Sequence, residues 1–183
     1  MHRLFVALRP PAPIRDLLAD SMDGVPAARW QDDEQLHLTL RYIGEVDRRV
    51  AEDAAEALSV IAAPAPEVAI AGVGRFEHKG CTEALWAGLT PYDPLAALHR
   101  KVDRALVTAG LAPERRAYLP HVTLARLSRG GGGEVEVAAW LARNAALASA
   151  PVTMGEMILY ESRLGRAGAS YTPVAEFPLT LPA

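Results

Sequence analysis

The chain has 183 residues, of which half are hydrophobic and 22% are charged, and its formal net charge is −3 at neutral pH. This composition excludes a disordered chain, and the length suffices for one domain, or two small lobes folded together, around a hydrophobic core. The negative net charge excludes a global attraction to polyanions, so a nucleic-acid ligand would need a local basic site.

Residue usage bounds the chemistry further. Arginine supplies 17 of the 19 basic residues, and a guanidinium offers a planar fork to phosphate oxygens, although most of these arginines are expected on the solvated surface. Cys81 is the only cysteine, which excludes an intrachain disulfide and fits a reducing compartment. The apolar run from Leu4 stops at Arg9, so we expect no signal peptide, no membrane span and a cytoplasmic protein.

The first half of the chain predicts the order strand, helix, strand, helix, strand. Short apolar runs bounded by proline or glycine predict strands, and apolar residues three or four positions apart predict helices. In chain order the expected elements are Leu4–Leu8, Ile14–Met22, His37–Gly44, Arg48–Ala62 and Val68–Val73.

The second half repeats this order, and an internal repeat of this kind points to two similar structural units. Its expected elements are Leu85–Leu89, Tyr92–Gly110, His121–Leu124, Val135–Ala148 and Val152–Tyr160. We therefore predict one two-lobed domain over residues 1–183, with a repeat of approximately residues 1–78 and 79–183. The expected fold class is α+β: two pseudo-symmetric lobes, each a small antiparallel sheet with helices on its outer face, facing each other across a central cleft.

Three connecting segments complete the prediction. Residues 75–80 are a candidate hinge between the halves. Arg129–Gly133 is rich in glycine but lacks the lysine and the serine or threonine of a phosphate-binding loop, so a flexible linker is favoured. Met157–Arg163 and Tyr171–Phe177 are expected to pair as a hairpin.

Two four-residue strings carry the chemistry, one in each half. Both read histidine, an apolar residue, threonine, leucine, and they begin at His37 and at His121. In a strand this spacing points His37 and Thr39 to one face, and likewise His121 and Thr123, while the apolar residues anchor the other face. Two facing lobes would bring both histidines to one cleft.

A pair of imidazoles suits in-line attack on a phosphodiester, because one can take a proton from water while the other gives one to the leaving alkoxide. The hydroxyls of Thr39 and Thr123 can donate hydrogen bonds to the phosphoryl oxygens. The two histidines have no metal-ligand spacing around them, so we expect neither a metal nor another cofactor. His2, His78 and His99 have no threonine partner and are expected on the surface.

The residues resemble the 2H phosphoesterases, and within them the RNA 2′,3′-cyclic phosphodiesterases first described as 2′-5′ RNA ligases. The resemblance spans the chain: Arg3–Leu8, then HLTLRYIG from His37, PHVTLAR up to Arg126, and Leu159–Leu164. It implies a LigT-like fold, and hydrolysis of RNA 2′,3′-cyclic phosphate ends to a 2′-phosphate, with reversible 2′-5′ ligation as the same chemistry in reverse. It also implies that His37 is the proton donor and His121 the proton acceptor.

Two arginines compete for the phosphate. Strand alternation places Arg41 on the face of His37 and Thr39 and places Arg126 on the face opposite His121, unless the second strand bulges or ends first. The resemblance instead favours Arg126, because related enzymes carry a substrate-contacting arginine five residues after the second histidine. We expect Arg126 to bind the phosphate and keep Arg41 as a second candidate.

Two other functions stay open. One is a nucleotide-binding or RNA-end-binding module without turnover. Such a module need not keep both histidines and both threonines. The other is a phosphodiesterase acting on a small cyclic nucleotide. The expected partners are RNA with a 2′,3′-cyclic phosphate end or a small cyclic nucleotide, with no membrane, and the protein is expected to be a monomer.

Overall fold

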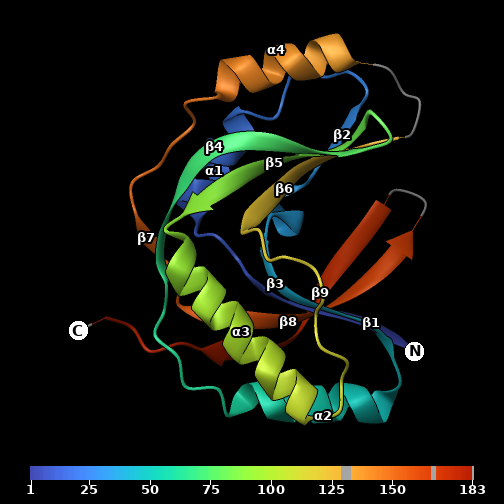
Figure 1. The fold of residues 1–183 in the computed structure, drawn as a ribbon, viewed down its shortest axis with the longest axis vertical. Coiled ribbons are helices and arrows are strands. Elements are labelled where there is room, and N and C mark those ends of the chain that lie inside the picture. Colours follow the sequence, from blue (N-terminus) through green and yellow to red (C-terminus); the bar gives the residue numbers. More distant parts are fainter. Residues whose placement is uncertain (129–132, 166–167, 183) are drawn as a thin grey trace.

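The computed structural model describes residues 1–128, 133–165 and 168–182 of the chain (Figure 1). The elements are β1 (His2–Leu8), α1 (Ala12–Asp20), β2 (Ala28–Trp30), the 3₁₀ turn η1 (Asp33–Gln35), β3 (Leu38–Val46), α2 (Arg48–Ser59), β4 (Glu67–His78), β5 (Cys81–Thr90), α3 (Tyr92–Thr108), β6 (His121–Leu127), α4 (Glu134–Asn144), β7 (Val152–Thr153), β8 (Glu156–Gly165) and β9 (Gly168–Pro178). The predicted order of strands and helices is confirmed in both halves.

The strands form one antiparallel sheet in the order β7-β4-β5-β6-β3-β1-β8-β9, with β2 paired to β6. The third strand of each half has crossed to the other half: β4 pairs with β5, and β8 pairs with β1. The two parts of the sheet join where β3 meets β6, at the pair Leu38 and Val122. The repeat boundary expected near residue 78 falls at the turn between β4 and β5.

The helices cover the outer faces of the two lobes and follow the same exchange. Helix α4 packs against β4 and β5, and α2 packs against β1 (Figure 1). Helix α3, from the second half, packs against β3 and α2. Ser21, which follows α1, accepts a hydrogen bond from the indole N–H of Trp140 in α4 at 2.7 Å. The α+β class with two similar lobes is therefore confirmed.

Side chains on β1 show how the sheet separates core from site. Leu4, Val6 and Leu8 lie in the main hydrophobic core, whereas Phe5 and Ala7 belong to a second, smaller cluster on the opposite face. This alternation is that expected of a strand with two covered faces. The face of Phe5 and Ala7 is the one that borders the motif residues.

Each motif strand carries a β-bulge directly after its threonine. On β3, Thr39 pairs with Ala7 and Arg41 with Val6, so Leu40 is an extra residue. A bulge of this kind reverses which face the following side chains occupy.

The second motif strand has the same defect. On β6, Thr123 pairs with Trp86 and Ala125 with Leu85, which leaves Leu124 as the extra residue. Leu124 and Ala125 are consecutive and both fully buried, as a break in alternation requires. The two bulges are therefore equivalent features of the two halves.

Several local predictions need correction. Residues 75–80 form no hinge: Arg75–His78 continues β4, and Lys79 and Gly80, both with positive φ, make a tight hairpin turn into β5. The first motif strand runs past Gly44 to Val46. Strand β2 was not predicted, because three residues carry too little periodicity.

Of the remaining local predictions, one is confirmed and others need correction. The hairpin at the C-terminal end is confirmed, with Met157 opposite Phe177 and Arg163 opposite Ser170. The helices α2 and α4 end about three to four residues earlier than their alanine-rich sequences indicate. The expected linker at residues 129–133 falls on residues 129–132, which lie outside the described residues.

Candidate active site

The junction of β3 and β6 gathers the four motif residues on one face. Leu38 and Val122 are direct partners and both are buried in the core. Their neighbours point the other way, so His37 lies opposite Thr123, and Thr39 lies opposite His121. The two histidines are diagonal neighbours, and such residues in an antiparallel pair lie about 7–8 Å apart.

Backbone carbonyls fix both imidazoles in the same way. The Nδ1–H of His37 donates to the carbonyl of Gln35 at 2.7 Å, and that of His121 donates to the carbonyl of Leu119 at 2.7 Å. In each case the acceptor lies two residues before the histidine. Because Nδ1 carries this proton, Nε2 is the nitrogen left for acid–base chemistry.

Aromatic rings surround His37. Its ring centroid lies 4.8 Å from Phe5, 5.1 Å from Tyr171 in an edge-on contact, and 6.3 Å from Tyr160. These rings come from β1, β8 and β9, so both the first strand and the exchanged C-terminal hairpin hold the histidine. The rings leave the imidazole half-buried and so reduce its contact with water.

His121 has a matching wall. Phe76 meets it edge-on at 4.9 Å, and Trp86 lies 6.1 Å away. Trp86 needs a glycine opposite it, since a Cβ on Gly74 would lie 2.2 Å from the indole Cζ2. The exchanged strand β4 thus supplies both a ring and a gap to the second half-site, as β8 supplies a ring to the first.

Burial governs the protonation of both histidines. It lowers the pKa of His37 to about 4, with smaller contributions that raise it from the Gln35 carbonyl and lower it from His121 and Arg126. Burial likewise lowers the pKa of His121, with the Leu119 carbonyl opposing and Arg126 adding to the effect. Both imidazoles are therefore neutral at pH 7 in the free protein. The positive charge of Arg126 therefore acts on both rings.

Arg126 faces the site because of the bulge at Leu124. It borders the same cleft as Thr39 and His121. No carboxylate among residues 1–128, 133–165 and 168–182 forms an ion pair with it. An exposed, unpaired guanidinium beside two neutral imidazoles is a ready anion-binding group.

Arg41 occupies a different environment. The bulge at Leu40 turns its side chain off the face of His37, so the prediction from simple alternation is wrong. Only 7% of Arg41 is exposed, its Nε donates to Asp103 at 2.6 Å, and Glu114 lies 3.7 Å from its Nη1. Its other nitrogens donate to the carbonyls of Tyr42 and Ala112. This guanidinium is committed to the protein, although part of it borders the cleft.

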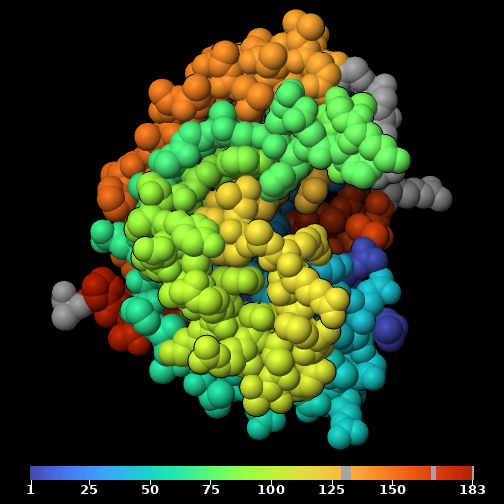
Figure 2. All heavy atoms as spheres, viewed as in Figure 1, coloured from blue at the N-terminus to red at the C-terminus, as the bar shows by residue number. Residues whose placement is uncertain are grey.

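The cleft has a volume of about 550 Å³. Figure 2 shows the molecule hollowed between the end of β4 (green) and the connection that follows α3 (yellow). The residues that line it are Thr39, Leu40, Arg41, Tyr42, Phe76, His99, Glu114, Arg116, Ala117, Tyr118, Leu119, His121 and Arg126. Three arginines against one glutamate make the cleft locally basic in a chain of net charge −3.

His99 was expected on the surface, and the structure places it in this cleft instead. Its Nδ1–H donates to the carbonyl of Leu40, the bulged residue of β3, at 2.6 Å. Its ring stacks on Tyr118 with centroids 4.3 Å apart and planes nearly parallel. The apolar stripe of α3 gave no sign of this position, because it predicts which face is buried and not which sheet that face meets.

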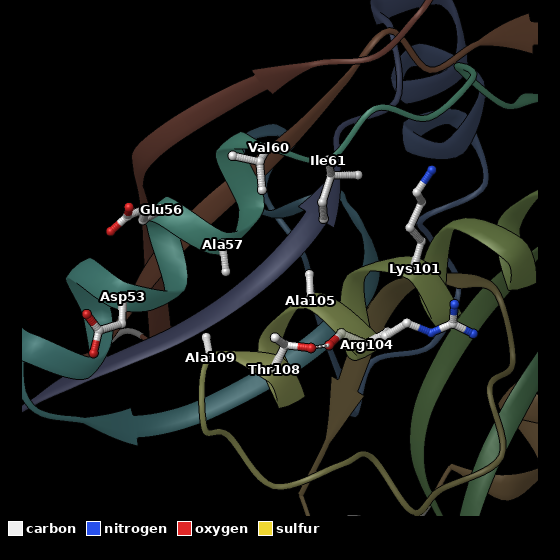
Figure 3. Close-up of a pocket in the computed structure, with 10 residues that line it drawn as sticks. All are labelled: Asp53, Glu56, Ala57, Val60, Ile61, Lys101, Arg104, Ala105, Thr108 and Ala109. Atoms are coloured by element: carbon white, nitrogen blue, oxygen red, sulfur yellow. Dashed lines mark hydrogen bonds between the residues drawn. The ribbon is translucent and has the colours of Figure 1, made fainter.

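A second hollow, of about 650 Å³, lies between α2 and α3 (Figure 3). The small side chains of Ala57, Ala105 and Ala109 leave the gap between the helices, with Asp53 on one rim and Lys101 on the other. It contains no motif residue, so the chemistry of the two strings does not extend there.

The described part of the chain holds no cluster of three or more histidine, cysteine or carboxylate side chains arranged to bind a metal ion. None of the described helices is long and apolar enough to cross a membrane.

Comparison with known proteins identifies the family. The model of the 2′-5′ RNA ligase superfamily matches residues 4–166. The chain belongs to the 2′-5′ RNA ligase superfamily. Both motifs, both bulges and Arg126 lie inside the matched region.

Two curated relatives have the same name. A protein named RNA 2′,3′-cyclic phosphodiesterase from Geobacillus stearothermophilus is 30% identical over 162 residues, which is 87% of this chain and 50% of that protein. A protein of the same name from Aeropyrum pernix is 35% identical over 117 residues, covering 63% of this chain and 65% of that one. The alignments thus span about half to two thirds of these relatives.

Solved structures share the fold over its whole length. E. coli LigT complexed with 3′-AMP superposes with a TM-score of 0.76 at 24% identity, covering 98% of both chains. A structure described as a phosphoesterase also gives a TM-score of 0.76, at 23% identity and 98% coverage of both chains. The LigT-like architecture is therefore confirmed.

Proposed function

We propose that this superfamily member hydrolyses the 2′,3′-cyclic phosphate at RNA ends to a 2′-phosphate by paired histidine acid–base catalysis. The observation that carries the proposal is the patch of His37, Thr39, His121 and Thr123 with the exposed guanidinium of Arg126 beside it. Membership of the superfamily and the names of the curated relatives support the same reaction class.

In the proposed reaction, Nε2 of His121 takes a proton from water as its oxygen attacks phosphorus. The P–O3′ bond breaks, and the protonated Nε2 of His37 gives its proton to the departing O3′. Phosphorus stays on O2′. With a 5′-hydroxyl of a second RNA in place of water, the same steps form a 2′-5′ bond, and their reverse cleaves it.

The phosphoryl oxygens gain charge in this step, and three groups are in place to meet them. The hydroxyls of Thr39 and Thr123 lie across from the two histidines, and Arg126 supplies a full positive charge. Arg41 is a weaker phosphate ligand in this scheme, because its donors are used by Asp103 and by backbone carbonyls. Asp103 and Glu114 also balance most of its charge.

One imidazole must be charged for the reaction. Burial keeps His37 neutral in the free protein, but an anionic phosphodiester next to it favours the charged form and raises its pKa. Binding of the substrate thus favours the protonated form of His37, which is the acid in the reaction. Because the two imidazoles handle the proton transfers and Arg126 meets the charge, we propose that no metal or other cofactor takes part.

The ligand in this proposal is an RNA end or a small cyclic nucleotide, and the protein acts as a cytoplasmic monomer. The cleft volume of about 550 Å³ suits a nucleotide. A binding module without turnover would need the arginine but would have no use for two imidazoles held with the same nitrogen free. The paired geometry therefore favours the enzyme.

The test is incubation of the purified protein with an oligoribonucleotide that ends in a 2′,3′-cyclic phosphate, in the presence of EDTA. We expect a 2′-phosphate end, which a general phosphomonoesterase removes and a 3′-specific phosphatase does not. Unchanged cyclic ends, with normal binding of the oligonucleotide, would establish the binding module instead. Activity that EDTA removes and one divalent ion restores would overturn the metal-free mechanism.

A further inference from the structure

The carbonyl of each bulged residue accepts a hydrogen bond from the other half of the chain. A β-bulge leaves its extra residue outside the strand ladder, and a carbonyl without a donor inside a protein is costly. The backbone N–H of Gln31, in the first half, donates to the carbonyl of Leu124 at 2.8 Å. The Nδ1–H of His99, in the second half, donates to the carbonyl of Leu40 at 2.6 Å. Each bulge thus depends on a donor from the opposite half.

The two donors differ in kind. A backbone N–H belongs to every residue except proline, so the bulge at Leu124 makes little demand on the side chain that donates to it. The bulge at Leu40 instead uses an imidazole that reaches across from α3. Because Leu40 directly follows Thr39, this donor fixes the backbone that carries the Thr39 hydroxyl.

The same imidazole also contacts the connection that leads to the second motif. The ring of His99 stacks on Tyr118, with centroids 4.3 Å apart and planes 4° apart. Tyr118 directly precedes Leu119, whose carbonyl accepts the Nδ1–H of His121 at 2.7 Å. One side chain of α3 therefore meets the residue after Thr39 and the residue before the carbonyl that orients His121.

A second anchor of this connection lies further from the motif. Asp103 in α3 accepts a hydrogen bond from the backbone N–H of Glu114 at 3.1 Å, five residues before Leu119. Closer to the motif, the buried hydroxyl of Tyr118 has no hydrogen-bond partner within the described part of the chain. The ring of Tyr92 is 6.4 Å from that of Tyr118 and gives a looser contact. Stacking on the imidazole is thus the close contact that fixes Tyr118.

We propose that His99 is a positioning residue that holds the two half-sites in one geometry. Its hydrogen bond to Leu40 sets the position of the Thr39 hydroxyl. Its ring, through Tyr118, sets the carbonyl that orients His121. The inference rests on the proposed function for the roles of these two motif residues in the reaction.

His37 supplies an internal reference for this role. Its Nδ1–H donates to the carbonyl of Gln35, and the side chain of Gln35 is hydrogen-bonded to the backbone of Asp32 and Ala169. These contacts involve η1 and β9 and not α3. Loss of the imidazole of residue 99 should therefore release His121 and leave His37 in place, whereas general loosening of the fold would affect both.

The test uses variants that separate the two contacts: His99→Asn, His99→Phe and the control Arg100→Ala. Asparagine places an N–H donor as many bonds from the backbone as Nδ1 but has no ring, whereas phenylalanine keeps the ring and has no donor. Arg100 is exposed on α3 and does not line the cleft. ¹⁵N NMR identifies the ring nitrogen that carries the proton in each histidine, and thermal melting verifies that each variant is folded.

In the natural chain we expect both motif histidines to carry the proton on Nδ1. In His99→Asn the two ring-nitrogen signals of His121 should move toward each other as the second tautomer becomes populated, while those of His37 stay in place. His99→Phe and Arg100→Ala should keep the natural signals of both histidines. An unchanged His121 in His99→Asn, or equal changes in both histidines, would overturn the inference.

The hydrogen bond to Leu40 is tested by a double-mutant cycle with Thr39→Val, in which calorimetry measures the affinity for inorganic phosphate. We expect His99→Phe and Thr39→Val each to weaken phosphate about fivefold. The double variant should bind about as weakly as either one, because both changes remove the contribution of the same hydroxyl. Losses that multiply, or no loss in His99→Phe, would overturn this link.

Both readouts are made at equilibrium and need no turnover. A protein that shows the expected dependence on His99 but leaves 2′,3′-cyclic phosphate ends uncleaved would therefore refute the proposed function alone. A protein that cleaves them while His121 is unaffected in His99→Asn would refute the positioning role alone.

Discussion

The two motif strands, β3 and β6, have the same backbone geometry but carry different side chains after the motif. Each carries a histidine whose Nδ1 donates to a carbonyl two residues earlier, a threonine on the same face, and a bulge after that threonine. After the bulge, β3 buries an arginine and exposes Tyr42, whereas β6 buries an alanine and exposes Arg126. The features shared by the two strands thus supply the two histidines. The difference between Tyr42 and Arg126 makes the two ends of the cleft chemically unlike.

The shared part of the design carries the largest expected effect. His37→Ala and His121→Ala should each lower kcat for a 2′,3′-cyclic phosphate about 10²- to 10⁴-fold, because each removes one proton-transfer partner. His78→Ala, on the exposed end of β4, is the matched control and should have no effect. Near-normal turnover in either motif variant would show that the two half-sites do not act together.

The arginines sharpen the comparison, because the strands treat them in opposite ways. Arg126→Met should lower kcat/KM about 10²-fold through loss of charge stabilisation while the free energy of unfolding stays unchanged. Arg41→Met should instead cost about 3 kcal/mol of stability by leaving the half-buried carboxylates of Asp103 and Glu114 without this cationic partner, with a smaller effect on the kcat/KM of the folded protein. Urea unfolding and steady-state kinetics measure both quantities, and the reverse ranking would mean that Arg41 is the phosphate ligand.

The threonines should show a smaller effect that is alike in the two halves. Thr39→Val and Thr123→Val each delete one hydroxyl donor and leave both imidazoles in place, so we expect losses of about tenfold in kcat/KM. Thr108→Val, at the end of α3 beside the hollow between α2 and α3 and outside the cleft, is the control. A loss as large as that of the histidine variants in one half only would argue that the hydroxyls have unequal roles.

The pH dependence is the smallest and most general effect. The reaction needs one charged imidazole, and burial lowers the pKa of both His37 and His121 in the free protein below the ordinary value of about 6.5. Fewer molecules carry that charge as the pH rises, so kcat/KM should decline through neutrality instead of peaking there. A maximum above pH 7 would show that the histidines are not enclosed as described.

The sequence predicts the elements that depend on local pattern. The order of strands and helices, the pairing of Met157 with Phe177 and the common face of each histidine and its threonine all follow from periodicity and turn residues. These features depend on neighbours in the chain, and the structure confirms them.

Two kinds of feature could not be predicted: the face that a side chain takes after a bulge, and contacts with residues far away in the sequence. One extra residue at Leu40 turns most of Arg41 into the interior and leaves only part of it at the cleft. Nothing in a single apolar string marks such a bulge. His99 reaches the cleft because α3 packs on the sheet of the other half. At Leu124 the sequence did suggest an irregularity, because strict alternation placed Arg126 on the face opposite His121 while the family resemblance placed it at the phosphate. The bulge at Leu124 explains how Arg126 reaches the face of His121.

The most direct test of the account is whether one phosphate engages both half-sites. The ring nitrogens of His37 and His121 can be followed by ¹⁵N NMR while adenosine 2′-monophosphate is added to the natural chain and to Arg126→Met. We predict that both Nε2 signals shift together, with a single dissociation constant and one ligand per chain, and that Arg126→Met weakens both responses equally. A shift confined to one histidine, or two different dissociation constants, would contradict the claim that the two motifs form one site.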